Sequence, residues 1–204
     1  MESGAGKRQV SPDALDRARA ALDRAHEGDP VRRTVDGREY PAERVWADTV
    51  LRWVRALEPE PSPVLELAAR AQHLERWLHP RSAWPAGRAG YLRWRREAAV
   101  RQGERAAALC TGAGLPPEFG AAVARLVRKE GLGRDPETIV LEDAACLAFL
   151  ELDLAAFSAR HEEDDVVRIL ARSWRKLSPR GQETALALDL PPGLRVLLDR
   201  ALAP

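Results

Sequence analysis

The stretch that decides the fold lies in the first half of the chain and reads VLELAARAQHLERWL at residues 64–78. Nearly every third or fourth position is apolar, which is the pattern of a helix buried on more than one side. Ser62 and Pro63 form a start signal, because a serine hydroxyl caps free amides and proline suits the first helical turn. Pro80 ends the run, since proline pushes the residue before it out of helical geometry. We therefore predict a central helix over residues 64–78, with His73 near its middle.

The remainder of the chain repeats this pattern of capped, apolar-striped segments. A second strongly apolar run covers about residues 139–159 and follows a capping signal at Asp135. Thr34 to Gly37 have turn chemistry, and no stretch shows convincing strand alternation. Further helices are predicted at about residues 12–27, 41–58, 88–110, 117–130, 166–174, 182–188 and 192–202. These patterns predict an all-α fold, a single-domain orthogonal bundle of about nine helices over residues 11–204, after a flexible N-terminus at residues 1–10.

The composition is that of a globular protein, with 45% hydrophobic and 31% charged residues in a chain of 204. The net charge is +1, from 32 basic and 31 acidic residues. This balance gives no general attraction to nucleic acid, although it leaves room for a local arginine patch. Frequent Ala, Arg, Leu and Pro indicate a GC-rich genome, and we expect a bacterial origin.

The two cysteines, Cys110 and Cys146, lie among alanine and leucine and are expected to be free thiols inside helices. No CxxC pair occurs, which excludes a zinc ribbon and a thioredoxin-type site. No apolar run approaches the roughly 20 residues that span a bilayer, and the first residues lack the hydrophobic core of a signal peptide. We therefore expect a cytoplasmic protein with no membrane partner.

Polar residues on the two most apolar helices are the candidates for chemistry. His73 lies on the first, and the pair Glu142-Asp143 lies on the second. A histidine and a carboxylate on two central helices could share a divalent metal. The structural alternatives are a core histidine bonded to the backbone and an acid pair that interacts with a helix dipole. His26, His79 and His161 are expected at the surface or at helix ends.

Arginine and aromatic residues alternate over residues 76–96. Guanidinium groups fork onto phosphate or carboxylate, and aromatic rings supply a stacking wall. This pattern fits a pocket for a small anionic molecule, a surface that contacts RNA, or a solvated helix face over packed tryptophans. A Gly-rich phosphate loop, HExxH and GxSxG are all absent, which removes the commonest nucleotide, zinc-hydrolase and nucleophile motifs. The residues expected to bind the anion are Gln72, Arg76, Trp77, Arg81, Tyr91 and Arg95.

Several longer motifs resemble the domain-of-unknown-function 4202 family over roughly residues 12–202. They are the segments at residues 68–77, 80–82, 91–95, 141–147, 174–178 and 188–192. This resemblance carries no established activity, so it bears on the fold more than on the function.

The order of the motifs also resembles, more faintly, the HD superfamily of metal-dependent phosphohydrolases. The resemblance implies an HD-like core in which Glu43 replaces the first histidine, Gln72-His73 the His-Asp pair and Asp143 the final acid. Relatives of this chain are expected often to carry a histidine where Gln102 stands, in which case this chain has lost a possible ligand.

Two functions from different classes follow. In the first, the protein is a metal-dependent enzyme acting on a small phosphate- or carboxylate-bearing substrate. Glu43, His73 and Asp143 would hold one divalent metal (iron, manganese or zinc), and His73 with Glu142 would carry the catalysis. In the second, the arginine-rich region 76–96 binds an anionic ligand, RNA or a partner protein without turnover. A third possibility is a helical scaffold whose polar core residues only fix its packing.

Overall fold

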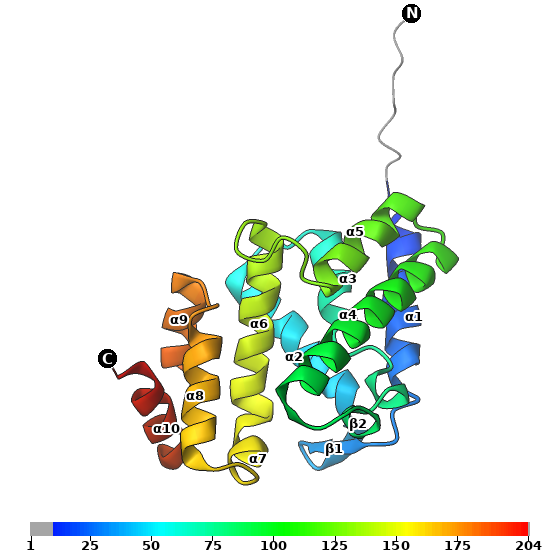
Figure 1. Cartoon of the computed structure of the whole chain (residues 1–204). Helices are drawn as coiled ribbons and strands as arrows, with labels where there is room; N and C mark the ends of the chain where they lie inside the picture. The colour runs from blue at the N-terminus through cyan, green and yellow to red at the C-terminus, as the bar shows by residue number, and fades with distance from the viewer. Residues whose placement is uncertain (1–9, 204) are drawn as a thin grey trace, which may run out of the picture.

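A computed structural model describes residues 10–203, and within them the chain folds into a bundle of α-helices (Figure 1). The all-α, single-domain fold is confirmed. The expected flexible segment at residues 1–10 lies, except for Val10, outside the described residues. The ten α-helices of this part are α1 (Pro12–His26), α2 (Ala42–Leu57), α3 (Pro63–Arg70), α4 (Gly87–Gly112), α5 (Pro117–Val127), α6 (Pro136–Leu152), α7 (Leu154–Ser158), α8 (Glu163–Trp174), α9 (Pro179–Leu186) and α10 (Pro192–Leu202).

Most helix starts follow the local signals. The Ser62 hydroxyl accepts a hydrogen bond from the Leu65 amide at 3.1 Å and caps α3. The Asp135 carboxylate does the same for α6, accepting from the Thr138 amide at 2.9 Å. Both caps satisfy amides that have no partner inside the helix, and a proline follows each.

The central helix is shorter than predicted, because α3 ends at Arg70 and not at Leu78. His73 and Glu75 both adopt left-handed backbone conformations, with φ of 59° and 51°. Such residues cannot continue a right-handed helix. The chain therefore makes tight turns over residues 71–75 and two short 3₁₀ helices, Arg76–Leu78 and Arg81–Ala83. The prediction that His73 lies in the middle of a helix was wrong.

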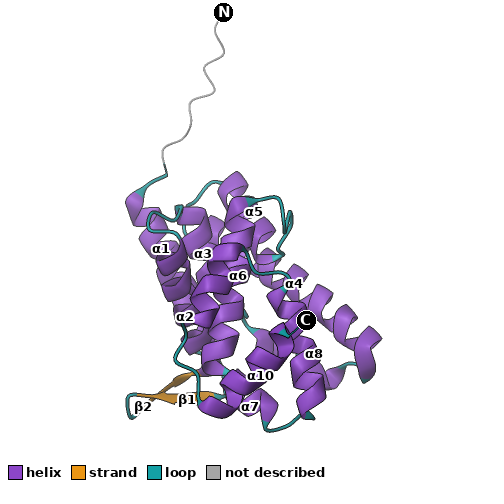
Figure 2. Ribbon diagram, turned by 90° about the vertical axis from the view of Figure 1, so that its left-hand side faces the viewer, coloured by secondary structure: helices purple, strands orange, loops and turns teal. Residues whose placement is uncertain are grey.

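A β-hairpin was also missed. Strands β1 (Arg32–Val35) and β2 (Arg38–Pro41) pair antiparallel, and Figure 2 shows them at one end of the molecule. The predicted turn is confirmed, since Asp36 and Gly37 connect the strands with φ of 50° and 75°. Two successive positive φ values suit the two-residue hairpin turn that Asp-Gly favours. Strands of four residues are too short to show a convincing alternation.

The core is built around α2, α3 and α6, which pack against one another. α6 is apolar on nearly all sides, as a helix enclosed by neighbours should be. The run predicted to reach residue 159 is divided at Asp153, and α7 begins at Leu154, so that residues 10–203 contain ten α-helices instead of about nine. Helices α8 and α10 pack together, α7 contacts both of them as well as α6, and α9 packs on α6 (Figure 1). None of the helices within residues 10–203 combines the length and the apolar character that a bilayer span requires.

Helix α4 differs from the others because its two halves have different surroundings. Its C-terminal half packs on α5 and buries Ala106 and Cys110. In its N-terminal half, over residues 87–96, only Gly90 and Trp94 are buried. A Cβ atom at position 90 would lie 1.9 Å from the Pro85 carbonyl oxygen, so the preceding loop packs directly against the helix backbone. The remaining faces of this half are open to solvent.

Candidate functional site

His73 is held on three sides at the end of α3. Its Nδ1–H donates to Oε2 of Glu43, the second residue of α2, at 2.9 Å. Its ring stacks on Trp46, with centroids 4.5 Å apart and planes inclined by 14°. Glu43 is placed in turn by Asp29, a buried residue whose carboxylate accepts from the Glu43 amide at 2.9 Å. These contacts from α2 keep His73 in its left-handed conformation, which would otherwise be unfavourable.

Arg76 completes this group. Its Nη1 lies 3.0 Å from Nδ1 and 3.2 Å from Nε2 of His73. Because Nδ1 carries the proton that is donated to Glu43, Nε2 is the nitrogen that accepts from Arg76. The guanidinium carbon also lies 5.0 Å from the centre of the Trp94 ring, within the range of a cation–π contact. Arg76 forms no ion pair within 4.0 Å of a carboxylate among the described residues, although its charge acts on Glu43 across the imidazole.

The pKa shifts of His73 and Glu43 agree with a neutral imidazole that lies between the Glu43 anion and the Arg76 cation. Burial, followed by the Arg76 charge, lowers the pKa of His73, and the Glu43 carboxylate only partly offsets this. Burial alone would raise the pKa of Glu43, but its bond to His73 and the charges of His73 and Arg76 outweigh burial and lower it. Near neutral pH, therefore, Glu43 is ionised, and His73 is neutral with its proton on Nδ1.

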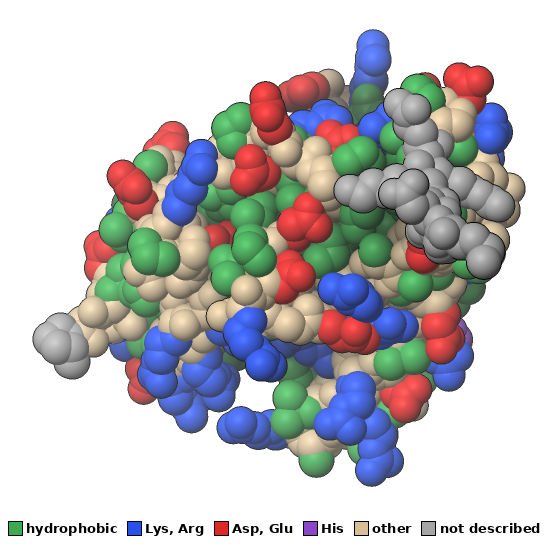
Figure 3. Space-filling model, turned by 90° about the horizontal axis from the view of Figure 1, so that it is seen from above, with side chains coloured by type: hydrophobic (Ala, Val, Ile, Leu, Met, Phe, Trp, Pro, Cys, Tyr) green, Lys and Arg blue, Asp and Glu red, His purple; other side chains and the backbone are tan. Residues whose placement is uncertain are grey.

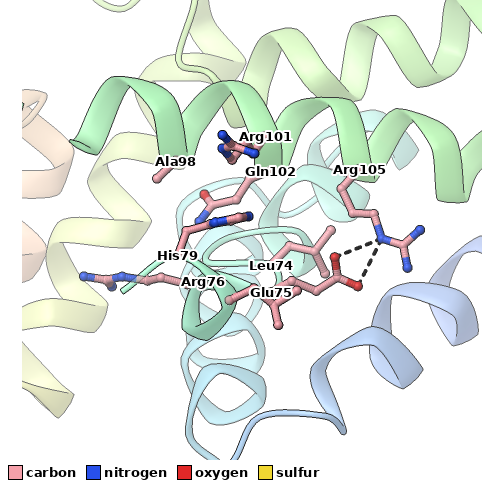
Figure 4. Close-up of a pocket in the computed structure, with 9 residues that line it drawn as sticks. Leu74, Glu75, Arg76, His79, Ala98, Arg101, Gln102 and Arg105 are labelled. Atoms are coloured by element: carbon pink, nitrogen blue, oxygen red, sulfur yellow. Dashed lines mark hydrogen bonds and ion pairs between the residues drawn. The ribbon is translucent and has the colours of Figure 1, made fainter. Parts of the chain in front are cut away.

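A pocket lies between the 74–79 segment and α4, with a volume of about 50 Å³ (Figure 4). Gln102 reaches from α4 towards His79, Arg101 lies beside it on α4, and the side chain of Arg76 runs away from Glu75. The residues that line the pocket are Leu74, Glu75, Arg76, Leu78, His79, Ala98, Arg101, Gln102 and Arg105.

The charges of this pocket are unequally paired. The Arg105 Nε donates to both carboxylate oxygens of Glu75, at 3.0 Å each. Arg101 forms no ion pair or hydrogen bond with the part of the chain that the structure describes, and Arg76 has no carboxylate there. One of the three guanidinium groups is thus neutralised, which leaves a positive pocket.

Glu142 lies in a separate cluster on α6. It is 3% exposed and forms an ion pair with Lys129, which precedes α6. The Lys176 Nζ lies 3.6 Å from its other carboxylate oxygen. Burial would raise the pKa of Glu142, but the charges of Lys129, Lys176 and Arg95 outweigh it and lower the pKa. The carboxylate is therefore ionised and enclosed by cations, which is the environment of a buried ion pair.

Asp143 points to the C-terminal helices. It accepts hydrogen bonds from the Ser178 amide at 3.0 Å and from the Ser178 hydroxyl, and that hydroxyl caps α9 by accepting from the Gly181 amide at 3.1 Å. Burial raises the pKa of Asp143, with a contribution from neighbouring Glu142, although the Ser178 bonds oppose the rise. Asp143 thus joins α6 to α9.

The three predicted metal ligands are only partly brought together. Glu43 and His73 are bonded, whereas Asp143 is engaged by Ser178. Within residues 10–203, no three His, Cys, Asp or Glu side chains form a group that could hold a metal ion. Glu142, the second predicted catalytic residue, contacts Lys129 and Lys176, and no bond connects it to His73.

The residues predicted to bind the anion are dispersed, and of these only Arg76 lines the pocket. Gln72 is buried and donates to the Ala68 carbonyl at 3.2 Å. Trp77 lies beside Gly28, and Arg81 donates to the Trp84 carbonyl at 3.0 Å within its own loop. Tyr91 and Arg95 are exposed on α4.

Sequence reasoning missed the contribution of Arg101 and Arg105 to the pocket. A usable signal existed, because residues 98, 101, 102 and 105 share one face of a helix. His79 was expected only at a helix end, and it also lines the pocket. His26 was expected at the surface or as a cap. It is fully buried, and its Nε2 lies 2.8 Å from the Arg70 carbonyl oxygen, so it caps the end of α3.

Comparison with known proteins supports the family assignment. No curated protein and no solved structure matches this chain. The model of one family, described as domain of unknown function (DUF4202), matches residues 16–198, which include α2 to α9 and all the residues discussed above. The chain therefore belongs to the DUF4202 family.

Proposed function

We propose that the protein binds a small anionic molecule through a phosphate or carboxylate group in the pocket between the 74–79 segment and α4. One observation carries this proposal: three arginines line the pocket, and a single carboxylate among the lining residues, that of Glu75, pairs with one of them. Unpaired guanidinium groups in a concave site are the usual means by which proteins recognise phosphate and carboxylate. Arg76 and Arg101 are the residues proposed to contact the anion.

The size of the pocket limits what it can receive. Its volume of about 50 Å³ is far below the roughly 300–1,000 Å³ of pockets that enclose a drug-sized ligand. It therefore suits one ionic group, with the rest of the molecule outside. Gln102 and His79 add hydrogen-bonding groups without negative charge.

In this proposal the Glu43–His73 pair positions Arg76. Neutral His73 accepts from the guanidinium at Nε2, while Glu43 fixes the ring through Nδ1. Trp94 supports the same guanidinium from its ring face. A preorganised arginine loses less conformational entropy when a ligand binds.

The test is the binding of simple anions to the purified protein. Titration calorimetry and thermal unfolding are measured with inorganic phosphate, sulfate and succinate at constant ionic strength. A ligand that binds only the folded protein raises its unfolding temperature. We expect phosphate or succinate to bind the wild type and to bind Arg101→Met at least tenfold more weakly. Arg134→Met removes an exposed arginine before α6 and is the matched control. Equal binding by Arg101→Met and the wild type would disprove the proposal.

A metal-dependent reaction is the second candidate. The observation that favours it is the Glu43–His73 bond, because a carboxylate at one ring nitrogen orients many metal-binding histidines. The described residues do not supply a third ligand beside this pair, so no step is assigned to a metal. Elemental analysis tests the idea: about one equivalent of iron, manganese or zinc that is lost in His73→Ala would support it. A metal content unaffected by His73→Ala would refute it.

The free thiols of Cys110 and Cys146 fit a reducing compartment, and we propose the cytoplasm.

A further inference from the structure

The N-terminal half of α4 carries a dense group of exposed arginines, of which only Arg95 acts on a nearby carboxylate of the described chain, through its charge on Glu142. Arg88, Arg93, Arg95 and Arg96 are all exposed, and none forms an ion pair or hydrogen bond with residues 10–203. We call these four residues and Tyr91 the α4 surface. It excludes Arg101, which belongs to the pocket. Arginines elsewhere in the described chain are commonly paired, as Arg44, Arg55 and Arg70 show.

The charge of this region contrasts with that of the whole protein. Of the 32 basic residues, eight lie in residues 76–105, whereas only two of the 31 acidic residues, Glu97 and Glu104, lie there. The net charge of the complete chain is +1. Viewed from above, Lys and Arg side chains gather along the lower side of the molecule (Figure 3). A locally positive face on a nearly neutral protein attracts polyanions that the net charge of the whole chain would not.

The α4 surface combines arginine with an exposed aromatic ring. Arg88, Tyr91 and Arg95 are spaced by three and four residues, which places them along one face of the helix. Tyr91 is 42% exposed, and its ring lies 5.9 Å from that of Trp94, which supports it from below. Arg93 and Arg96 form a second pair at helical spacing. The region from position 88 to position 96 is about 12 Å long at 1.5 Å per residue.

The exposed arginines and the Tyr91 ring distinguish among three possible polyanions: a lipid surface, a nucleic-acid duplex and a single strand. A helix that inserts into a lipid surface needs a continuous apolar face, which a helix half with arginines on several sides lacks, and headgroup charge alone would leave the Tyr91 ring without a stacking partner. A duplex keeps its bases stacked internally and would leave the Tyr91 ring without a partner. A single strand offers both phosphates to arginine forks and an unstacked base to an aromatic ring. We propose that the α4 surface binds single-stranded nucleic acid, with the four arginines on phosphates and Tyr91 stacked on a base.

The proposal does not depend on the pocket. The four arginines of the α4 surface do not line the pocket, and its Tyr91 meets the anion-binding group only through Trp94. Arg101, which lines the pocket and lies outside the α4 surface, therefore distinguishes the two proposals. If the pocket alone is functional, phosphate binding will respond to Arg101→Met and not to changes on the α4 surface. If the α4 surface alone is functional, the opposite pattern will appear.

The experiment measures fluorescence anisotropy with three labelled probes: a 12-nucleotide oligouridine, a 12-nucleotide oligothymidine and a 12-base-pair duplex. We expect both single strands to bind at 50 mM NaCl, with log K falling against log salt at a slope of about −3 for four phosphate contacts. Arg93→Glu/Arg96→Glu should weaken binding at least tenfold and flatten the slope. Tyr91→Ala should weaken binding about tenfold, as for the loss of one stacked base. A preference for uridine or thymidine identifies RNA or DNA as the source.

Three controls keep the result unambiguous. Arg134→Glu reverses a charge outside the α4 surface and should leave binding unchanged, and circular dichroism verifies that each variant is folded. Arg101→Met should retain most of the strand affinity. The proposal is overturned if no single strand binds at low salt, if the duplex binds as tightly as the single strands, or if Tyr91→Ala binds like the wild type.

Discussion

Glu43 and His73 are joined by a 2.9 Å hydrogen bond between Oε2 and Nδ1, although 30 positions separate them in the chain. The bond connects the first turn of α2 to the left-handed turn that follows α3. It therefore fixes both the direction of the chain after Arg70 and the side of the imidazole that faces Arg76.

A double-mutant cycle should detect this contact. We expect Glu43→Gln and His73→Phe to couple by about 0.5–3 kcal/mol in the free energy of unfolding, because the residues are in contact and partly buried. Urea unfolding of both single variants and the double variant gives the coupling. The exposed pair Asp165 and Arg168 on α8 provides the comparison, with about 0.2–1 kcal/mol expected. A coupling near zero for Glu43 and His73 would mean that the bond is absent in solution.

Stability should decrease on mild acidification. Burial lowers the pKa of both His26 and His73, so in the folded protein both protonate below the usual histidine pKa of about 6.5. As pH falls below that value, the unfolded chain binds more protons, and the free energy of unfolding decreases. Urea unfolding at pH 7.5 and 5.5 measures the loss. His26→Gln, which can still donate to the Arg70 carbonyl, should show a smaller loss, and an unchanged loss would exclude His26 as a contributor.

Glycine should be better tolerated than alanine at position 75. Glu75 has a φ of 51°, where an L-residue with a side chain costs roughly 1–2 kcal/mol. Both substitutions remove the ion pair with Arg105, so their difference isolates the backbone. We expect Glu75→Gly to be more stable than Glu75→Ala by about 1 kcal/mol in urea unfolding. Glu104, within α4, should show the reverse order, since alanine favours a helix interior. The same order at both positions would contradict the left-handed turn.

A methyl group at position 181 should loosen α9. A Cβ atom there would lie 2.6 Å from the Asp143 Cγ, closer than real contacts allow. Gly181→Ala must therefore displace the carboxylate that accepts from Ser178, and we expect a loss of about 1–3 kcal/mol. Gly193→Ala, in α10, has open space around it and should be neutral or slightly stabilising. Chemical denaturation of both variants decides the matter, and two equal effects would be inconsistent with this packing.

The helix boundaries were largely predictable, because proline and capping residues act locally. Ser62 and Asp135 cap the helices that the sequence assigned to them. The end of α3 was not predictable from the same signals. Its cause is the conformation of His73 and Glu75, and the residues that hold them, Glu43 and Arg105, lie 30 positions away on either side. Local propensity cannot report contacts at that separation.

The type of residue in the candidate site was predictable from the sequence, but the particular residues that line the pocket were not. The sequence indicated an arginine-rich anion region, but the pocket uses Arg101 and Arg105, which qualify only when α4 packs beside the 74–79 segment. Glu142 was predicted either to take part in catalysis or to interact with a helix dipole, and neither prediction included its two lysine partners. Lys129 and Lys176 reach it from opposite directions along the chain, a relationship that periodicity does not reveal.

The two adjacent carboxylates of α6 have a consequence for synthesis of the protein. Asp143 is satisfied by Ser178, and Glu142 shares its charge between Lys129 and Lys176. While the ribosome has released only the first 160 residues or so, Asp143 has no partner and Glu142 has one of its two cations. Because Gly181 of α9 packs directly on the Asp143 carboxylate, that group stays in water until α9 brings its burial and its hydrogen bonds together. The nascent bundle therefore gains its final enclosure only when residues 176–178 leave the exit tunnel, so that the last helices complete the interior of the first.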